Sequence, residues 1–200
     1  MTNHWVDLQN CKTILVEGSN VAENHPMAFK WIRKAQENGA KIIHVDPRYT
    51  RTSAAADVYA PIRPGTDAAL QNTMINHIIV NKLYDEDYVV THTNALFLSD
   101  EAFDFKDGVF SGYDEENHKY DTTTWGYQLD GKGKPRVAAS LDAPHCVFQR
   151  LAKFVSRYTL ETGERITGIP AEQIRQIAET MAKNRPGAIL YGLGMTQHTT

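Results

Sequence analysis

The sequence predicts an α/β fold in which parallel β-strands alternate with helices. Two short runs of apolar and β-branched residues, Thr13-Ile14-Leu15-Val16 and Lys41-Ile42-Ile43-His44-Val45, are typical of buried strands. The segment between them begins with Pro26 at a first helical turn, repeats apolar residues at helical spacing and stops at Asn38-Gly39. A strand, a helix and a strand within about thirty residues form a βαβ unit, for which a parallel sheet with a right-handed crossover is expected.

The rest of the chain extends this plan to a Rossmann-like sheet. Residues 50–57 have no clear period, and 58–62 are predicted to form a short strand. The turn Pro64-Gly65-Thr66-Asp67 is expected to lead into a helix, with Asp67 as its N-cap. The remaining predicted elements are helices over 86–90, 147–157 and 170–184 and a third buried strand over 188–191.

The character of the chain changes over about 100–145. Glycines punctuate this stretch and its periodicity is weak, so we expect an insertion with hairpins or irregular structure. Disorder is not expected, because too many aromatic side chains occur there to be left in water. These are Phe103, Phe105, Phe110, Tyr113, Tyr120, Trp125 and Tyr127. The predicted organisation is an α/β part over 1–99, the insertion over 100–145, and a return to the α/β domain over 146–200.

Composition excludes several classes of protein. The formal charge of -3 is too small to favour nucleic acid as a partner. The longest apolar runs have the length of strands, which argues against a membrane span. The two cysteines, Cys11 and Cys146, form no CxxC motif, so these residues alone build neither a zinc site nor an iron–sulfur site. Met1-Thr2-Asn3-His4-Trp5 has no pattern of a secretory signal.

Small, polar or acidic residues gather where predicted strands end, which is where open α/β sheets bind ligands. The first cluster runs from Gly18-Ser19-Asn20 through Glu23 to His25-Pro26. Its small residues would let backbone N–H groups approach a phosphate, although a tight strand-to-helix turn explains them equally well. The glycine-containing cluster 192–198 is similar in kind and follows the last predicted strand.

Two acids follow predicted strand ends. Asp46 could accept hydrogen bonds from a ribose diol, or simply cap the turn before Pro47. Arg48 and Arg51 offer charge for phosphate oxygens, although exposed arginines on loops are common. Asp67 could accept the N1–H and exocyclic amine of guanine as a bidentate pair, or serve only as an N-cap.

Together these clusters resemble the molybdopterin oxidoreductase family. The segments 18–26, 45–52, 64–67 and 192–198 occur in that family's order and approximate spacing. Within the family, the chain is similar to the catalytic subunit of formate dehydrogenases of the periplasmic or respiratory, selenocysteine-containing type. That similarity depends on residues 1–5, on 105–114 within the insertion, and on 155–159.

The resemblance implies a bis-molybdopterin guanine dinucleotide cofactor carrying molybdenum or tungsten. It also implies oxidation of formate to carbon dioxide, an iron–sulfur electron-transfer subunit as partner, and a periplasmic parent enzyme. The residues that it places along the cofactor are Gly18, Ser19, Asn20, Glu23, His25, Asp46, Arg48, Thr50, Gly65, Asp67, Gly194, Thr196 and Gln197.

The resemblance assigns no catalytic or metal-binding residue to this chain. In such enzymes the selenocysteine or cysteine on the metal and the cysteines of the iron–sulfur cluster lie upstream of the segment that matches Met1. We therefore expect an internal piece of a larger, multi-domain subunit, with both ends cut and no activity of its own. Alternatives are a piece of another molybdopterin oxidoreductase and an autonomous nucleotide-binding module. Glu17 departs from the apolar residue that the family usually has, so its charge should be solvated, paired or protonated.

Overall fold

The computed structural model describes residues 3–106 and 108–198, which form two compact units. The first unit combines the chain up to Leu83 with the chain from Tyr158 onward, and the second unit comprises Tyr84–Arg157. Met1 and Thr2 of the N-terminal motif, and Asp107 of the insertion motif, lie outside the described residues. The predicted boundaries at 99/100 and 145/146 both fall within the second unit.

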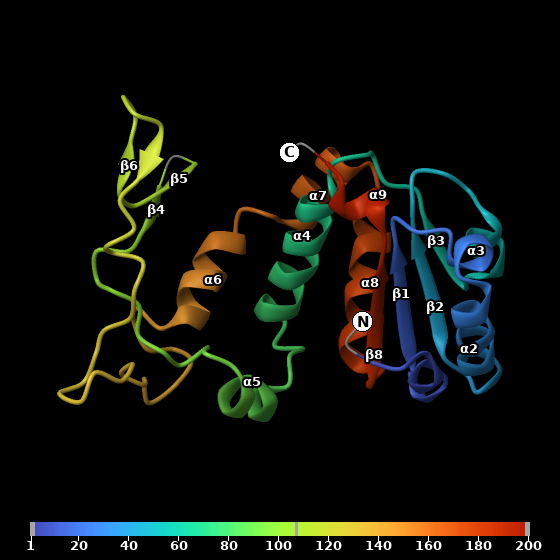
Figure 1. Ribbon diagram of the computed structural model, residues 1–200, viewed down its shortest axis with the longest axis horizontal. Helices are drawn as coiled ribbons and strands as arrows, with labels where there is room; N and C mark the ends of the chain where they lie inside the picture. The colour runs from blue at the N-terminus through green and yellow to red at the C-terminus, as the bar shows by residue number, and fades with distance from the viewer. Residues whose placement is uncertain (1–2, 107, 199–200) are drawn as a thin grey trace. The chain divides into compact units, whose positions relative to one another are not determined.

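The first unit is built on a parallel sheet of four strands (Figure 1). Their order is β3 (Val58–Ala60), β2 (Lys41–Val45), β1 (Thr13–Glu17) and β8 (Gly187–Tyr191). The register aligns Glu17 with Val45 on one side and with Tyr191 on the other. The carboxyl ends of three strands therefore lie level, as the predicted α/β fold with a parallel sheet requires, and that prediction is confirmed.

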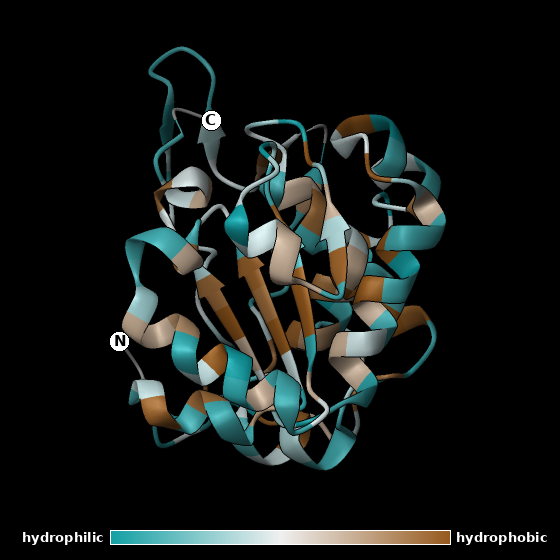
Figure 2. Cartoon of the chain, turned by 90° about the vertical axis from the view of Figure 1, so that its right-hand side faces the viewer, coloured by the Kyte–Doolittle hydropathy of each residue, from teal (hydrophilic) through white to brown (hydrophobic). Residues whose placement is uncertain are grey.

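Helices cover both faces of this sheet (Figure 1). One face carries η1 (Trp5–Asn10), α1 (Val21–Asn24), α2 (Pro26–Glu37) and α3 (Arg51–Ala55), and the other carries α4 (Asp67–Val80), α7 (Leu160–Thr167) and α8 (Ala171–Lys183). Alternate residues of β1 supply the two cores: Ile14 and Val16 pack towards α2, and Leu15 packs towards α4 and α8. Because both faces are covered, the strands are hydrophobic along most of their length (Figure 2).

Several details differ from the prediction. The strand β8 is at the edge of the described sheet, with Ile189 52% and Tyr191 65% exposed, so the prediction of a buried strand there is wrong. A strand that has a neighbour on one side only loses the cover that a central strand receives. The N-cap of α4 is Thr66, and Asp67 is the first residue of the helix, so Asp67 is not the cap.

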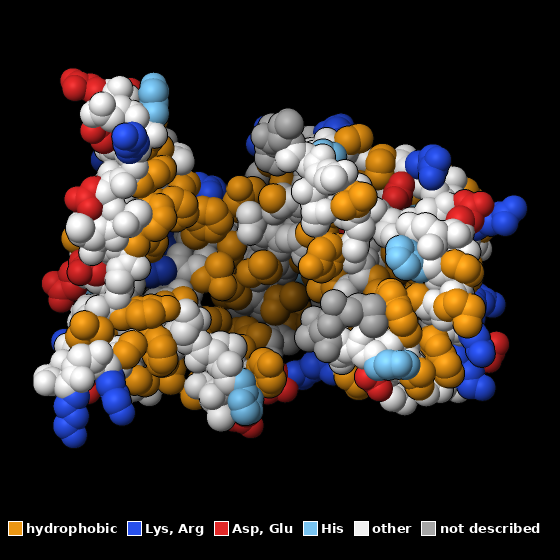
Figure 3. Space-filling view, viewed as in Figure 1, with side chains coloured by type: hydrophobic (Ala, Val, Ile, Leu, Met, Phe, Trp, Pro, Cys, Tyr) orange, Lys and Arg blue, Asp and Glu red, His pale blue; other side chains and the backbone are white. Residues whose placement is uncertain are grey.

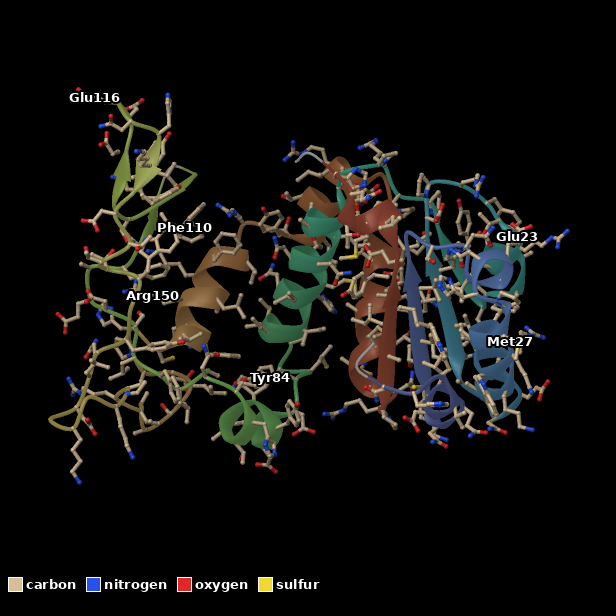
Figure 4. All side chains as sticks on the ribbon, viewed as in Figure 1. Glu23, Met27, Tyr84, Phe110, Glu116 and Arg150 are labelled. Atoms are coloured by element: carbon tan, nitrogen blue, oxygen red, sulfur yellow. The ribbon has the colours of Figure 1, made fainter. Side chains whose placement is uncertain are left out.

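The second unit contains short hairpins and two helices. Its elements are α5 (Glu86–His92), β4 (Phe105–Lys106), β5 (Val109–Phe110), β6 (Tyr113–Asp114), β7 (Lys119–Tyr120) and α6 (Val147–Val155). The pairs β4–β5 and β6–β7 are antiparallel. The ring of Phe110, labelled in Figure 4, lies 4.9 Å from that of Phe105 and 5.5 Å from that of Trp125. The aromatic rings pack against one another, but Tyr113, Tyr120, Trp125 and Tyr127 stay 37–42% exposed, so they are less withdrawn from water than the composition predicts.

Hydrophobic side chains gather over the β4–β5 hairpin and α6 of this unit (Figure 3). They line a hollow of about 720 Å³ that also contains Arg150 and Lys153. Both cations lie within ion-pair distance of Asp104, Lys153 at 2.9 Å and Arg150 at 3.8 Å. Arg150 and Lys153 are therefore paired within the unit.

One charged residue interrupts the buried strand β1. Glu17 has no exposed surface, and Gln71 on α4 donates a hydrogen bond from Nε2 to its Oε2. Its Oε1 has no hydrogen-bond partner among the described residues. Burial, followed by the negative charge of Asp67, raises the pKa of Glu17 from 4.5 to about 7. The sequence-based expectation of a paired or protonated acid agrees with this environment.

We expect the raised pKa of Glu17 to make the unfolding free energy of the protein depend on pH. The folded protein holds this proton more tightly than the unfolded chain, so the contribution of Glu17 is full below pH 4.5 and is lost as pH rises to about 7. A shift of this size corresponds to roughly 3 kcal/mol of unfolding free energy at 25 °C. Urea denaturation across this range should show that loss for the wild type relative to Glu17→Gln, whose side chain does not titrate. The exposed Glu37→Gln is the matched control, and an equal pH dependence of all three proteins would contradict the prediction.

Candidate functional site

The turns that follow β1 and β8 pack backbone against backbone. Gly194 N donates to Gly18 O at 3.1 Å, and Gly192 N donates to Glu17 O at the same distance. Gly18 has a φ of +60°, and a Cβ atom there would lie 2.5 Å from Met195 N. A Cβ atom on Gly194 would lie 2.8 Å from Gly18 O. Glycine is therefore required at both positions for the two turns to meet.

The first turn is closed onto α3 by a polar network. Thr52 Oγ1 donates to Asn20 Oδ1 at 3.0 Å and accepts from Ala22 N at 3.0 Å. Asn20 Nδ2 also donates to the Glu23 carboxylate, and Glu23 lies 3.4 Å from Arg51 Nε. Figure 4 labels Glu23 on α1. The predicted residues Asn20 and Glu23 thus lie together, held by Thr52, which the sequence analysis did not select.

A buried histidine on β2, His44, contacts the backbone of the same turn. His44 Nε2 lies 3.2 Å from Ser19 O, which can only accept, so Nε2 carries the proton and Nδ1 accepts from Ser53 Oγ at 2.8 Å. Burial lowers the pKa of His44, although the charge of Asp46 opposes that shift. His44 is therefore a neutral support for Ser19. The predicted residue His25 is exposed, with Nδ1 2.8 Å from Asn24 Oδ1.

Asp46 follows β2 and is fixed by its neighbours. Its Oδ1 accepts from Arg48 N at 2.8 Å, and Tyr59 donates its hydroxyl to Asp46 O at 3.0 Å. The side chain keeps 13% exposure, so a carboxylate edge remains open to a ligand. Thr50 is the N-cap of α3 and its Oγ1 accepts from Thr52 N at 3.2 Å, so this predicted site residue has a structural role.

Asp67 begins α4 after the turn at Gly65, whose φ is +78°. It is 7% exposed and lies beside Glu17, whose pKa it helps to raise. His198 Nε2 lies 4.0 Å from Asp67 Oδ2 and 2.6 Å from Gly194 O. The segment that follows α9 (Leu193–Thr196) therefore reaches the start of α4.

The two acids lie at the same end of the sheet but on its two sides. Side chains alternate between the two faces of a strand, so Asp46 is on the same face of the sheet as His44, which contacts α3. Asp67 lies beside Glu17, on the face that α4 covers. The turn at Gly18 follows the strand between them. No hydrogen bond or ion pair joins the two acids within the part of the chain that the structure describes. Three other predicted site residues are exposed at this end of the sheet: Arg48, Thr196 and Gln197.

The buried residues that hold the candidate site in place could not be recognised in the sequence. Glu17 is visible in the sequence only as a departure from the family pattern, and Gln71 has the appearance of an ordinary helix residue. His44 and Thr52 have no signal, because their roles depend on contacts across the βαβ unit. Cys11 and Cys146 are both free thiols.

The arrangement offers donors and acceptors for a polar ligand. Within residues 3–106 and 108–198, the N–H groups of Ser19 and Asn20 have no acceptor, and Asp46 and Asp67 present carboxylate oxygens. No group of three or more metal-ligating side chains was found among those residues. Nor does any described helix have the length and apolarity to cross a membrane.

Replacing Gly194 by alanine should separate the two turns. The added Cβ would meet the Gly18 backbone, which cannot move aside as a flexible side chain would. We expect Gly194→Ala to lower the unfolding free energy by about 1–3 kcal/mol in urea denaturation. Gly131→Ala is the matched control, because its Cβ would meet nothing within 4 Å. If the two variants unfold alike, the close approach of the turns is not a constraint.

The chain is similar to known proteins over its whole length. The family model of molybdopterin oxidoreductases matches residues 1–200. Formate dehydrogenase subunit alpha of Megalodesulfovibrio gigas is 47% identical and formate dehydrogenase-O major subunit of Escherichia coli (strain K12) is 44% identical, each over all of the chain. The chain spans 20% of the length of each of these curated relatives.

A solved structure has the same fold. Acetylene hydratase from Pelobacter acetylenicus superposes with a TM-score of 0.61 and 25% sequence identity, covering 92% of this chain and 18% of that one. These findings confirm the resemblance that the four turn clusters predict. The chain belongs to the molybdopterin oxidoreductase family.

Proposed function

We propose that the chain forms one wall of the site for molybdopterin guanine dinucleotide in the catalytic subunit of a formate dehydrogenase. The observation that carries this proposal is the meeting of the Gly18 and Gly194 turns between Asp46 and Asp67 at one end of the sheet. The 44–47% identity to formate dehydrogenase subunits along the whole chain supports the choice of enzyme. Family membership supports the choice of cofactor.

The residues present fit a dinucleotide. Gly18 and Gly194 let the two turns pack backbone against backbone, which brings the segments 18–20 and 194–197 together at one end of the sheet. The unpaired N–H groups of Ser19 and Asn20 suit phosphate oxygens, and Arg48 adds charge from the exposed loop. Asn20 and Glu23 form the rim of this turn with Thr52, and Ser19 and His25 lie at either end of it.

The two acids divide the recognition of the nucleoside. Asp46 accepts hydrogen bonds from the ribose hydroxyl groups through its open edge. Asp67 accepts from the N1–H and the exocyclic amine of guanine, which present two donors side by side. Gly65 gives the chain the left-handed turn that delivers Asp67 to this position.

Residues after β8 would meet the pterin end of the cofactor. These are Gly194, Thr196 and Gln197, of which the last two are exposed. When bound, the cofactor supplies the molybdenum or tungsten centre at which formate is oxidised to carbon dioxide. In this proposal the metal ligand and the iron–sulfur cluster belong to other parts of the subunit, an iron–sulfur subunit accepts the electrons, and the enzyme works in the periplasm.

The base preference of the site provides the test of this function. A carboxylate offers two acceptors, whereas an asparagine amide offers one acceptor and one donor, which matches xanthine better than guanine. We expect the wild type to prefer GMP to XMP, and Asp67→Asn to reverse the preference, with about a tenfold change in the ratio of dissociation constants. Titration calorimetry or ligand-observed NMR gives both constants.

The exposed Asp87→Asn is the matched control and should keep the wild-type preference. A preference for GMP that survives Asp67→Asn would remove Asp67 from the base site. Absence of nucleotide binding by all three proteins would overturn the proposed wall itself.

Because the proposed site binds the cofactor and has no catalytic residue, we expect the chain alone not to oxidise formate. Its residues bind and orient, and the groups that act on formate lie elsewhere in the proposed enzyme. Purified chain incubated with cofactor extracted from a molybdoenzyme should reduce an artificial electron acceptor no faster with formate than without it. Formate-dependent reduction above that background would show that the chain carries catalytic residues.

A further inference from the structure

Glu17 is a buried acid directly behind the proposed base-recognition residue. It has no exposed surface, whereas Asp67 keeps 7% exposure and faces the open end of the sheet. Gln71, one turn along α4 from Asp67, donates to Glu17 Oε2, which leaves Oε1 as a fully buried oxygen without a partner among the described residues. An unpaired buried oxygen of this kind is costly unless something satisfies it.

Among the described residues around Glu17, Asp67 is the group that could accept a proton shared by hydrogen bond. The neighbouring strands present Val45 and Tyr191 at its register positions, and α8 contributes the apolar Ile174 and Ile177. From α4 come Gln71 and Asp67, and His198 lies 4.0 Å beyond, against the far oxygen of Asp67. Asp67 is thus the negative charge that acts on Glu17.

Two ionised carboxylates repel each other and cannot form a hydrogen bond. If Glu17 carries a proton, its Oε1–H becomes a donor to Asp67 and the orphaned oxygen is satisfied. Glu17, with no exposed surface, is the more deeply buried of the two carboxyl groups, and burial favours its neutral form. A carboxylate has lone pairs enough to accept from Glu17 and from a base at once.

We propose that Glu17 is a positioning residue, a neutral carboxylic acid whose hydrogen bond holds the Asp67 carboxylate in place for a guanine base. The proposal rests on the proposed function and adds to it a dependence on pH. While Glu17 is protonated, Asp67 is oriented by a donor. When Glu17 ionises, the donor is lost and like charges repel, so guanine binding weakens as pH rises.

The test is the pH profile of guanosine affinity, since guanosine has no phosphate group to titrate. Dissociation constants are measured by calorimetry from about pH 5.5 to about pH 8.5 for the wild type, Glu17→Gln and Glu17→Leu. We expect wild-type affinity to fall about fivefold with rising pH, the size of effect expected from one lost hydrogen bond. Glu17→Gln, whose amide still donates to Asp67, should bind with the affinity of the protonated wild type and show no such fall. Glu17→Leu, which has no donor, should bind more weakly than Glu17→Gln at every pH.

His198 Nε2 lies 4.0 Å from Asp67 Oδ2, so His198→Gln is measured in parallel. A wild-type fall in affinity that persists in His198→Gln and vanishes in Glu17→Gln supports Glu17 as the source. Parallel profiles for the wild type and Glu17→Gln, with base preference still controlled by Asp67, would overturn this inference and leave the proposed function intact. Absence of guanosine and GMP binding in every protein would overturn both.

A second measurement follows the proton itself, without any ligand. Infrared difference spectra of the wild type, taken across the same pH range, should contain the carbonyl stretch of a protonated carboxylic acid that disappears on titration. This band should be absent from Glu17→Gln and present in Glu37→Gln, whose carboxyl is exposed in the wild type. Difference spectra in which the wild type and Glu17→Gln do not differ would show that Glu17 does not change its protonation over this range and would overturn the proposed dependence on pH.

Discussion

The close approach of two glycine turns, after β1 and after β8, is the constraint on which the candidate site depends. The two strands are neighbours in the sheet although they come from opposite ends of the first unit's sequence. Their register sets Glu17 level with Tyr191, so both turns begin at the same height. A shift of one residue would exchange the two faces of the strand and place Glu17 among the residues that pack on α2. The backbone contact between Gly18 and Gly194 is therefore a consequence of strand register, and it brings the two turns of the candidate site together.

Most of the first unit could be predicted because its signals are local. The runs that became β1 and β2 are apolar, of strand length and bounded by turn residues, and Pro26 and Gly39 mark the ends of α2. The exposure of β8 could not be predicted, because an apolar run is the same in sequence whether its strand is central or at an edge. Thr50 shows a related ambiguity: a threonine before a helix can cap it or contact a ligand, and the hydrogen bond to Thr52 N shows capping.

The residues at the surface of the candidate site could be predicted from the sequence, but the buried residues that hold them in place could not. Gly18, Asp46 and Asp67 each follow the end of a strand or begin a helix, so their place at the edge of the sheet follows from topology. The faces from which the two acids approach depend on side-chain alternation in β2 and on how α4 packs over β1. Both are long-range properties. The neutral His44 beneath Ser19 was equally hidden, because in sequence it is one polar residue within an apolar strand.

Glu17, Gln71 and Asp67 are best understood as one unit. An apolar residue at position 17 would remove the cost of burying an acid, but it would leave the Gln71 amide without its acceptor inside a packed interface. Replacing Gln71 instead would remove the hydrogen bond to Glu17 Oε2 and leave the acid with two unsatisfied oxygens. In this chain the hydrogen bond between Gln71 and Glu17 therefore lowers the cost of burying both polar groups.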